Sequence, residues 1–255
     1  MMDKRIGAQL FTLRDYCKTA EELDTTFAKL QQIGYQIVQV SAVGPIPAEI
    51  IKETADKYGL KIVCTHKGFQ DYTDHLEQLI ADHHAMDCKI AGIGAMPREA
   101  WGNFEEVKKF VKTMNPIAAE LKKSGLQFAY HNHALEFAKV NGKFMMDYLL
   151  EETDPENFKF IVDTYWLAVA GINPAEFIRK LGKRAVCVHF KDLEIVENNA
   201  VMAEVMEGNL DWDAIIAACE DVGTQWALVE QDICRRDPFE SMEISYNNLK
   251  TKGFC

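Results

Sequence analysis

Short apolar segments alternate with longer amphipathic segments along the chain. The apolar segments favour strands, because they are brief and rich in β-branched and aromatic residues. The amphipathic segments favour helices; the one over residues 19–33 opens with Thr19-Ala20-Glu21-Glu22 as a capping box and closes at Gly34. The expected strands are residues 5–11, 36–40, 60–64, 89–93, 126–130, 158–162, 184–189 and 226–230, and the expected helices are residues 19–33, 47–58, 71–86, 104–123, 144–152, 174–181, 211–222 and 238–250.

This alternation predicts a parallel sheet. Strands that are apolar on both faces and separated by helices are typical of parallel pairing with helices on the outside. Eight repeats that close on themselves form a single (β/α)8 TIM barrel, and a chain of 255 residues has the usual size of that fold. A doubly wound open sheet is the alternative, but Gln9-Leu10-Phe11-Thr12 is not its glycine-rich turn. No Pro-, Gly- or Ser-rich linker divides the chain, so we expect one TIM-barrel domain over residues 1–255.

Four of the later strands end in residues that bind protons or metals. The fifth runs into Tyr130-His131-Asn132-His133 with Glu136 just beyond, and the next three deliver Asp163, His189 and Glu230. A single carboxylate at a strand end is more often a helix cap or an ion-pair member. Recurrence on four consecutive strands favours a metal site at one rim, because three buried carboxylates repel one another without a cation. Three carboxylates and one imidazole suit Mn²⁺, Mg²⁺ or Co²⁺, with Zn²⁺ also open.

The net charge and the cysteine spacing indicate which partners and which cellular compartment to expect. The formal net charge of −11 disfavours nucleic acid, which requires clustered Lys and Arg. The seven cysteines are scattered without a C-x-x-C pair, which indicates reduced thiols in the cytoplasm. Neither a signal peptide nor an apolar run of membrane-spanning length is evident. We therefore expect a cytoplasmic protein that acts on a small molecule and has no membrane or nucleic-acid partner.

Five motifs, in order along the chain, carry a family resemblance: Gly7 to Asp15, Tyr130 to His133 with Glu136, Val188 to Asp192, Gly208 to Trp212, and Val229 to Asp232. The chain resembles the xylose isomerase-like TIM-barrel superfamily, and within it the sugar phosphate isomerase/epimerase-type proteins. That group includes ketose 3-epimerases, inosose dehydratases and enzymes that process 3-keto-glycosides. The resemblance implies one divalent metal ion and a homo-oligomer. The implied metal ligands are Glu136, Asp163, His189 and Glu230.

The resemblance also implies catalytic roles. In the epimerase branch, residues in the positions of Glu136 and Glu230 move protons, whereas His133 resembles the base of the branch that cleaves keto-glycosides. A metal that binds a substrate carbonyl acidifies the neighbouring C–H bond. Returning the proton gives isomerisation or epimerisation, and losing a β substituent gives elimination. We predict a metal-dependent isomerase or epimerase of a small sugar or keto sugar. The alternatives are a lyase or dehydratase acting on an inosose or 3-keto-glycoside and, as a non-enzyme, a sugar-binding subunit of a partner enzyme.

Other residues on the same rim are candidate substrate contacts: His66, Lys191, His131 and Trp101. For His66 a structural hydrogen bond stays equally open. Lys191 either stabilises an oxyanion or pairs with Asp192 or Asp163. For Trp101 ordinary core packing is the alternative to an apolar wall against the sugar.

Three further features lead to expectations. Relatives often carry an acidic residue after the second strand, where this chain has Gln39. Residues 193–210 show no pattern, so they form either a lid or partner contact or a tolerated surface insertion. His75, His83 and His84 fall in a predicted helix and are expected at its surface.

Overall fold

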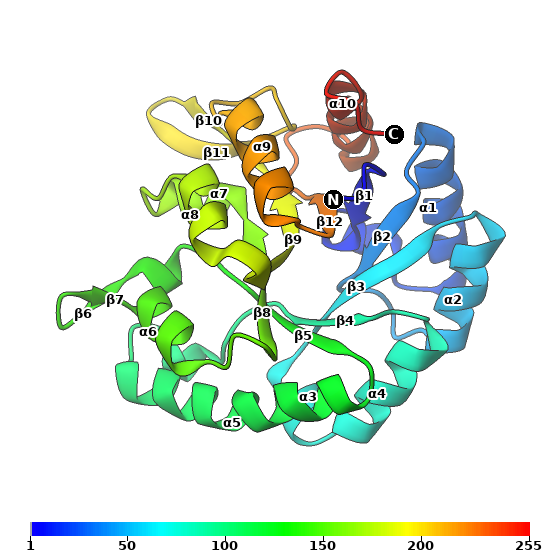
Figure 1. Cartoon of the computed structure of the whole chain (residues 1–255). Coiled ribbons are helices and arrows are strands. Elements are labelled where there is room, and N and C mark those ends of the chain that lie inside the picture. The colour runs from blue at the N-terminus through cyan, green and yellow to red at the C-terminus, as the bar shows by residue number, and fades with distance from the viewer. Residues whose placement is uncertain (1) are drawn as a thin grey trace.

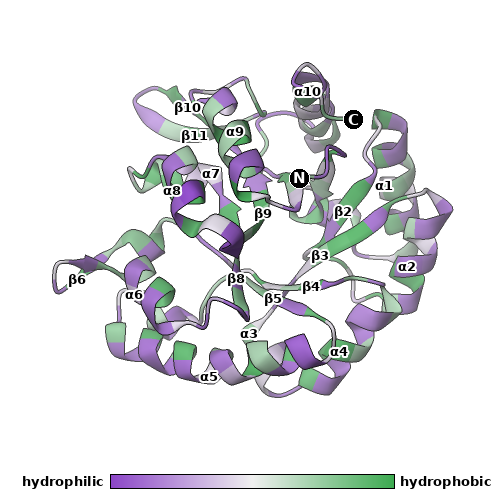
Figure 2. Cartoon of the chain, viewed as in Figure 1, coloured by the Kyte–Doolittle hydropathy of each residue, from purple (hydrophilic) through white to green (hydrophobic). Residues whose placement is uncertain are grey.

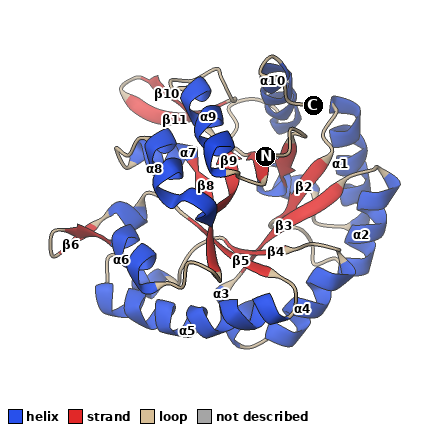
Figure 3. Ribbon diagram, viewed as in Figure 1, coloured by secondary structure: helices blue, strands red, loops and turns tan. Residues whose placement is uncertain are grey.

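Eight parallel strands close into a barrel in the computed structural model, which describes residues 2–255 (Figures 1 and 3). The order β1-β12-β9-β8-β5-β4-β3-β2 returns to its start, so none of these eight barrel strands has a free edge. The predicted (β/α)8 TIM barrel is confirmed, and the open sheet is excluded. The barrel strands are β1 (Gly7–Gln9), β2 (Ile37–Val40), β3 (Lys61–Lys67), β4 (Ile90–Ile93), β5 (Gln127–His131), β8 (Phe158–Asp163), β9 (Ala185–Phe190) and β12 (Trp226–Val229).

Helices surround the barrel, and each carries both hydrophobic and hydrophilic residues (Figure 2). The first helix begins and ends as the sequence predicts: Thr19 and Glu22 form both hydrogen bonds of the capping box, and Gly34 ends the helix in the left-handed conformation. The single helix predicted over residues 71–86 is instead two helices, because the chain breaks at Asp74 and His75. The helices are α1 (Ala20–Ile33), α2 (Ala48–Lys57), α3 (Phe69–Thr73), α4 (Leu76–Ala85), α5 (Phe104–Lys123), α6 (Met145–Glu152), α7 (Thr164–Val169), α8 (Pro174–Leu181), α9 (Trp212–Val222) and α10 (Pro238–Lys250).

The segment after β9 contains a hairpin that sequence patterning did not predict. Strands β10 (Asp192–Val196) and β11 (Asn199–Ala203) pair antiparallel and lie beside α7 and α9 (yellow in Figure 1). Their turn is formed by Glu197 and Asn198, which both have positive φ, as tight hairpin turns require. The carboxylate of Asp192 then accepts hydrogen bonds from the Trp212 indole and from three backbone N–H groups of residues 206–210. A buried acid therefore holds this segment in place. A second short hairpin joins β6 (Lys139–Val140) to β7 (Lys143–Phe144).

The interior of the barrel explains where polar groups gather. Side chains alternate along each strand, so residues two apart share a face. Buried apolar residues on the inward face form one cluster, which includes Ala129, Ile161, Cys187 and Leu228. Two positions beyond them, on the same face and nearer the carboxyl ends of the strands, come His131, Asp163, His189 and Glu230.

One helical histidine lies where the sequence did not predict it. His83 is fully buried, and its ring bridges the Thr65 hydroxyl at 2.8 Å and the Leu79 carbonyl at 2.7 Å. Burial lowers the pKa of His83 to about 4. The expectation of a surface group was wrong for this residue, because α4 packs that face against β3; His75 and His84 are exposed as predicted. None of the helices among the described residues is both long and apolar enough to cross a bilayer.

Candidate active site

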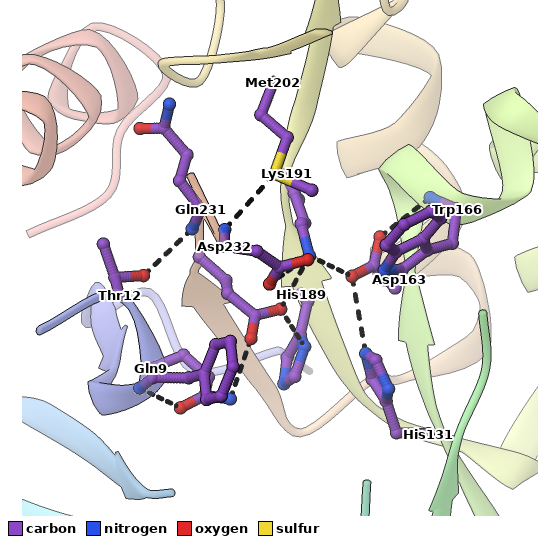
Figure 4. Close-up of polar contacts among 12 residues, drawn as sticks. Gln9, Thr12, His131, Asp163, Trp166, His189, Lys191, Met202, Gln231 and Asp232 are labelled. Atoms are coloured by element: carbon purple, nitrogen blue, oxygen red, sulfur yellow. Dashed lines mark hydrogen bonds and ion pairs between the residues drawn. The ribbon is translucent and has the colours of Figure 1, made fainter. Parts of the chain in front are cut away.

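Four buried side chains from neighbouring strands meet at the carboxyl end of the barrel. His131 ends β5, Asp163 ends β8, His189 lies in β9 and Glu230 directly follows β12. Each offers one ligand atom, and these four atoms all lie within 4.8 Å of one another. Figure 4 shows the imidazoles of His131 and His189 and the carboxylate of Asp163 pointing toward a common region. This four-donor centre has the ligand types and the closeness that a divalent metal ion requires.

Each carboxylate of the centre uses one oxygen to anchor itself to the protein. Asp163 Oδ1 accepts the backbone N–H of Trp166 at 3.0 Å, which caps α7, and its Oδ2 faces the other donors. Glu230 Oε1 accepts from the Gln9 side-chain amide at 2.9 Å, and its Oε2 faces the other donors. The centre therefore receives one fixed carboxylate oxygen from each acid.

The two histidines are held with one ring nitrogen toward the centre. His131 Nδ1 lies 3.0 Å from the Gly94 carbonyl, which can only accept, so Nδ1 carries a proton, and Nε2, 3.4 Å from Asp163 Oδ2, is the nitrogen directed to the centre. His189 Nε2 donates to Gln39 Oε1 at 2.8 Å, which leaves Nδ1 for the centre. That Nδ1 lies 2.8 Å from Glu230 Oε2, yet it forms no hydrogen bond of acceptable geometry within the described part of the chain. In each ring the nitrogen that points to a carboxylate oxygen is the one that a cation shared with that oxygen could bind.

Glu136, a predicted ligand, does not join the four-donor centre. Its carboxylate is fully buried and accepts the Tyr130 hydroxyl at 2.5 Å and the His133 backbone N–H at 2.7 Å. Burial raises the pKa of Glu136 to about 7, although the hydrogen bond from Tyr130 opposes that rise. The structure gives no support to Glu136 as a ligand, for a geometric reason. Glu136 lies in a short 3₁₀ turn after β5 has ended, whereas His131 still belongs to the strand and has the inward parity.

A buried lysine lies against the centre. Lys191 Nζ is 2.8 Å from Asp232 Oδ1, 3.3 Å from Asp163 Oδ2 and 3.4 Å from Glu230 Oε2 (Figure 4). Burial disfavours the charged amine, but these three carboxylates outweigh it and raise the pKa of Lys191. Of the two aspartates considered for Lys191 from the sequence, Asp163 is a partner and Asp192 is not. Sequence reasoning did not assign a role to Asp232, although it is two residues beyond Glu230 and therefore shares its face.

A cavity of about 590 Å³ opens onto the centre and is lined by residues that include Phe11, His66, His133 and Glu230. The ring of His66 lies 5.0 Å from that of His131, between centroids. Within the described residues, His66 Nε2 and His133 Nδ1 are buried without a hydrogen-bond partner. Burial lowers the pKa of both, that of His133 to about 3, so both rings are neutral at neutral pH. Two neutral imidazole nitrogens thus remain for polar groups of a substrate.

Trp101 does not reach this cavity. Its side chain lies in the loop between β4 and α5, is 48% exposed, and donates its indole N–H to the Met96 carbonyl at 3.2 Å. Aromatic residues near the centre include Phe11, which lines the cavity, and Trp166, whose ring lies 5.4 Å from that of His133. The structure therefore gives no support to Trp101 as a substrate contact.

Comparisons with known proteins identify the family of this chain and a relative with a known activity. The family model described as xylose isomerase-like TIM barrel matches residues 27–246. An inosose dehydratase of Mesomycoplasma hyopneumoniae (strain 7448) is 24% identical over 206 residues, which cover 71% of this chain and 66% of that protein, just under two thirds of its length.

Solved structures show the same fold. A sugar phosphate isomerase/epimerase from Parabacteroides distasonis has a TM-score of 0.79 at 21% identity, covering 100% of this chain and 96% of that one. D-allulose 3-epimerase from Methylomonas sp. has a TM-score of 0.74 at 14% identity, covering 99% of each chain. At these identities the likeness is one of fold.

Proposed function

The chain belongs to the xylose isomerase-like TIM-barrel family, and from that premise we propose that it is a metal-dependent lyase that eliminates water or an alcohol from a keto sugar or inosose. The observation that carries the proposal is the four-donor centre beside a cavity that His131 and Glu230 help to line. The inosose dehydratase relative supports this reaction class.

His131, Asp163, His189 and Glu230 would hold the ion. Two imidazoles and two carboxylates are a softer set than the one predicted from the sequence. This set favours Mn²⁺, Co²⁺ or Zn²⁺ over Mg²⁺, which prefers an all-oxygen shell. When bound, the ion supplies Lewis acidity that makes the C–H bond beside a substrate carbonyl easier to break.

His133 is the proposed base. It lines the cavity, its ring is neutral at neutral pH, and its Nδ1 has no partner among the described residues. In the proposed reaction His133 removes the proton next to the carbonyl, and the C–H electron pair forms a carbon–carbon double bond as the β C–O bond breaks. His133 then gives the proton to the departing oxygen, which leaves as water or an alcohol. Atoms and charge balance with one base and no redox partner.

An epimerase is the second candidate, and it was the first prediction from the sequence. The two-glutamate form of that reaction is disfavoured, because Glu136 is engaged by Tyr130 and His133 and does not join the centre. What keeps epimerisation open is that His133, which follows β5, and Glu230, which follows β12, both line the cavity. Two groups on opposite sides of a substrate carbon can remove a proton from one face and return it to the other.

Metal analysis of the purified protein, followed by incubation with inososes, 3-keto-glycosides and ketoses in D₂O, tests the proposal. We expect a bound divalent ion and loss of water or aglycone with an unsaturated product. Deuterium incorporation with inversion and without loss of any group would establish the epimerase. Tight sugar binding without exchange or turnover would overturn both and indicate a sugar-binding subunit.

A further inference from the structure

Lys191 brings a positive charge to the oxygens that a metal ion would use. Its side chain is fully buried. The ammonium lies 3.3 Å from Asp163 Oδ2 and 3.4 Å from Glu230 Oε2, and these are the oxygens that face His131 and His189. The anchored oxygens of both acids are occupied by Trp166 and Gln9 and cannot take over. An ammonium and a divalent ion therefore depend on the same two oxygens.

Asp232 offers the ammonium a second place. Its Oδ1 is the nearest carboxylate oxygen to Nζ, at 2.8 Å, and it does not belong to the four-donor centre. The Asp232 side chain is 24% exposed and lines the cavity, unlike the fully buried Asp163. Its backbone N–H is held by the sulfur of Met202 in β11, which fixes it beside the rim. Lys191 can thus keep one carboxylate partner after losing the other two.

We propose that Lys191 is a resident counter-ion of the four-donor centre, which a divalent metal ion must outcompete and which then pairs with Asp232. This inference rests on the metal centre of the proposed function. It follows from charge balance, because buried carboxylates without a cation are costly and two cations beside the same oxygens repel each other. It predicts that the lysine sustains the fold without metal and weakens metal binding.

The decisive measurement is the affinity for Mn²⁺ by calorimetric titration of the metal-stripped protein. Lys191→Met should bind Mn²⁺ at least about tenfold more tightly than the wild type. In chelator it should melt at a lower temperature, and Mn²⁺ should raise its melting temperature by more than that of the wild type. Lys191→Gln, which can still hydrogen-bond a carboxylate, keeps the test valid if the methionine variant does not fold without metal.

Two further variants separate this role from general charge effects. Lys159 lies on the same face of β8 as Asp163 but at the other end of the strand, where its Nζ binds the Pro155 carbonyl. Lys159→Met should therefore leave the Mn²⁺ affinity unchanged. Asp232→Asn should weaken Mn²⁺ binding in the wild type, and the loss should shrink in the Lys191→Met background because Asp232 acts through the lysine.

Each alternative outcome is decisive. Equal Mn²⁺ affinities for the wild type and both Lys191 variants would overturn the counter-ion role while leaving the metal centre standing. Loss of Mn²⁺ affinity in Lys191→Met and Lys191→Gln would also overturn it, and would show that the lysine supports the bound ion. Absence of Mn²⁺ binding in every protein would overturn the metal centre of the proposed function as well.

Discussion

Glu230 and Glu136 are two buried glutamates at the same end of the barrel, and their surroundings differ in kind. Glu230 faces Lys191 and His189, which hold its pKa well below the usual range in spite of burial. Glu136 faces only neutral donors, the Tyr130 hydroxyl and the His133 N–H, and burial raises its pKa to about 7. One carboxylate is kept ionised beside the Lys191 ammonium, and the other accepts two hydrogen bonds that hold the loop after β5.

This contrast shows that burial and residue type do not assign a role by themselves. Both glutamates come after strands, and both match a motif in the sequence. What separates them is where the strand ends. Glu230 directly follows β12 and keeps the inward parity of Leu228, whereas the chain turns before it reaches Glu136. The partners follow from that position, and the chemistry follows from the partners.

Replacing Glu230 with Gln should have the largest effect. The variant keeps the shape of the side chain but loses a charge that the centre needs, so we expect activity to fall by at least about a hundredfold and Mn²⁺ affinity to fall with it. Chemical denaturation should show that the fold is retained, because the amide can still pair with Gln9. Full turnover by this variant would show that the centre is placed wrongly.

Replacing Gln39 tests whether its hydrogen bond to His189 supports metal binding, and it should have a smaller effect than Glu230→Gln. Gln39→Leu removes the acceptor that fixes the His189 proton on Nε2, which should weaken Mn²⁺ binding by about ten- to a hundredfold. Gln39→Glu restores an acceptor and is the matched control, with affinity at or above that of the wild type. If the leucine variant bound Mn²⁺ normally, the orientation of His189 would not depend on this contact.

The fold could be predicted from the sequence because barrel geometry depends on local signals. The alternation of apolar strands and amphipathic helices is repeated eight times, so an error at one boundary, such as the break at His75, does not change the topology. The β10–β11 hairpin was missed because its order depends on a distant contact, the Asp192 carboxylate with the Trp212 indole.

The candidate site could be predicted only in part. The positions of Asp163, His189 and Glu230 follow from strand parity, which a single sequence reveals. His131 has the same parity in β5, so strand parity places it beside these three, whereas the family resemblance implies Glu136. The place of the Lys191 ammonium could not be predicted, because it depends on side chains from three strands at once.

Glu136→Gln should affect activity least among these substitutions, although the sequence resemblance predicts complete loss. The amide oxygen can accept the His133 N–H while the amide nitrogen donates to Tyr130, so we expect a loss of about tenfold or less and unchanged Mn²⁺ affinity. Glu136→Ala leaves both donors buried without an acceptor and should lower the free energy of unfolding by about 2 to 4 kcal/mol. Loss of Mn²⁺ binding in Glu136→Gln would return this residue to the centre.

The pH dependence of stability in the wild type and in Glu136→Gln distinguishes the two glutamates. The pKa of Glu136 rises from 4.5 to about 7 on folding, so the native state holds a proton there that the unfolded chain has released. Native stability therefore falls as the pH rises from 4.5 to about 7, and levels off above that range. Denaturation in chelator should show this decline in the wild type and a shallower one in Glu136→Gln.

Glu230 contributes in the opposite direction and at lower pH, because its pKa is lowered on folding and its stabilisation is lost as the pH falls. Identical profiles for the two proteins between pH 4.5 and about 7 would mean that Glu136 is ionised in the native state across that range, like Glu230, and that neutral partners suffice to hold a buried carboxylate charged.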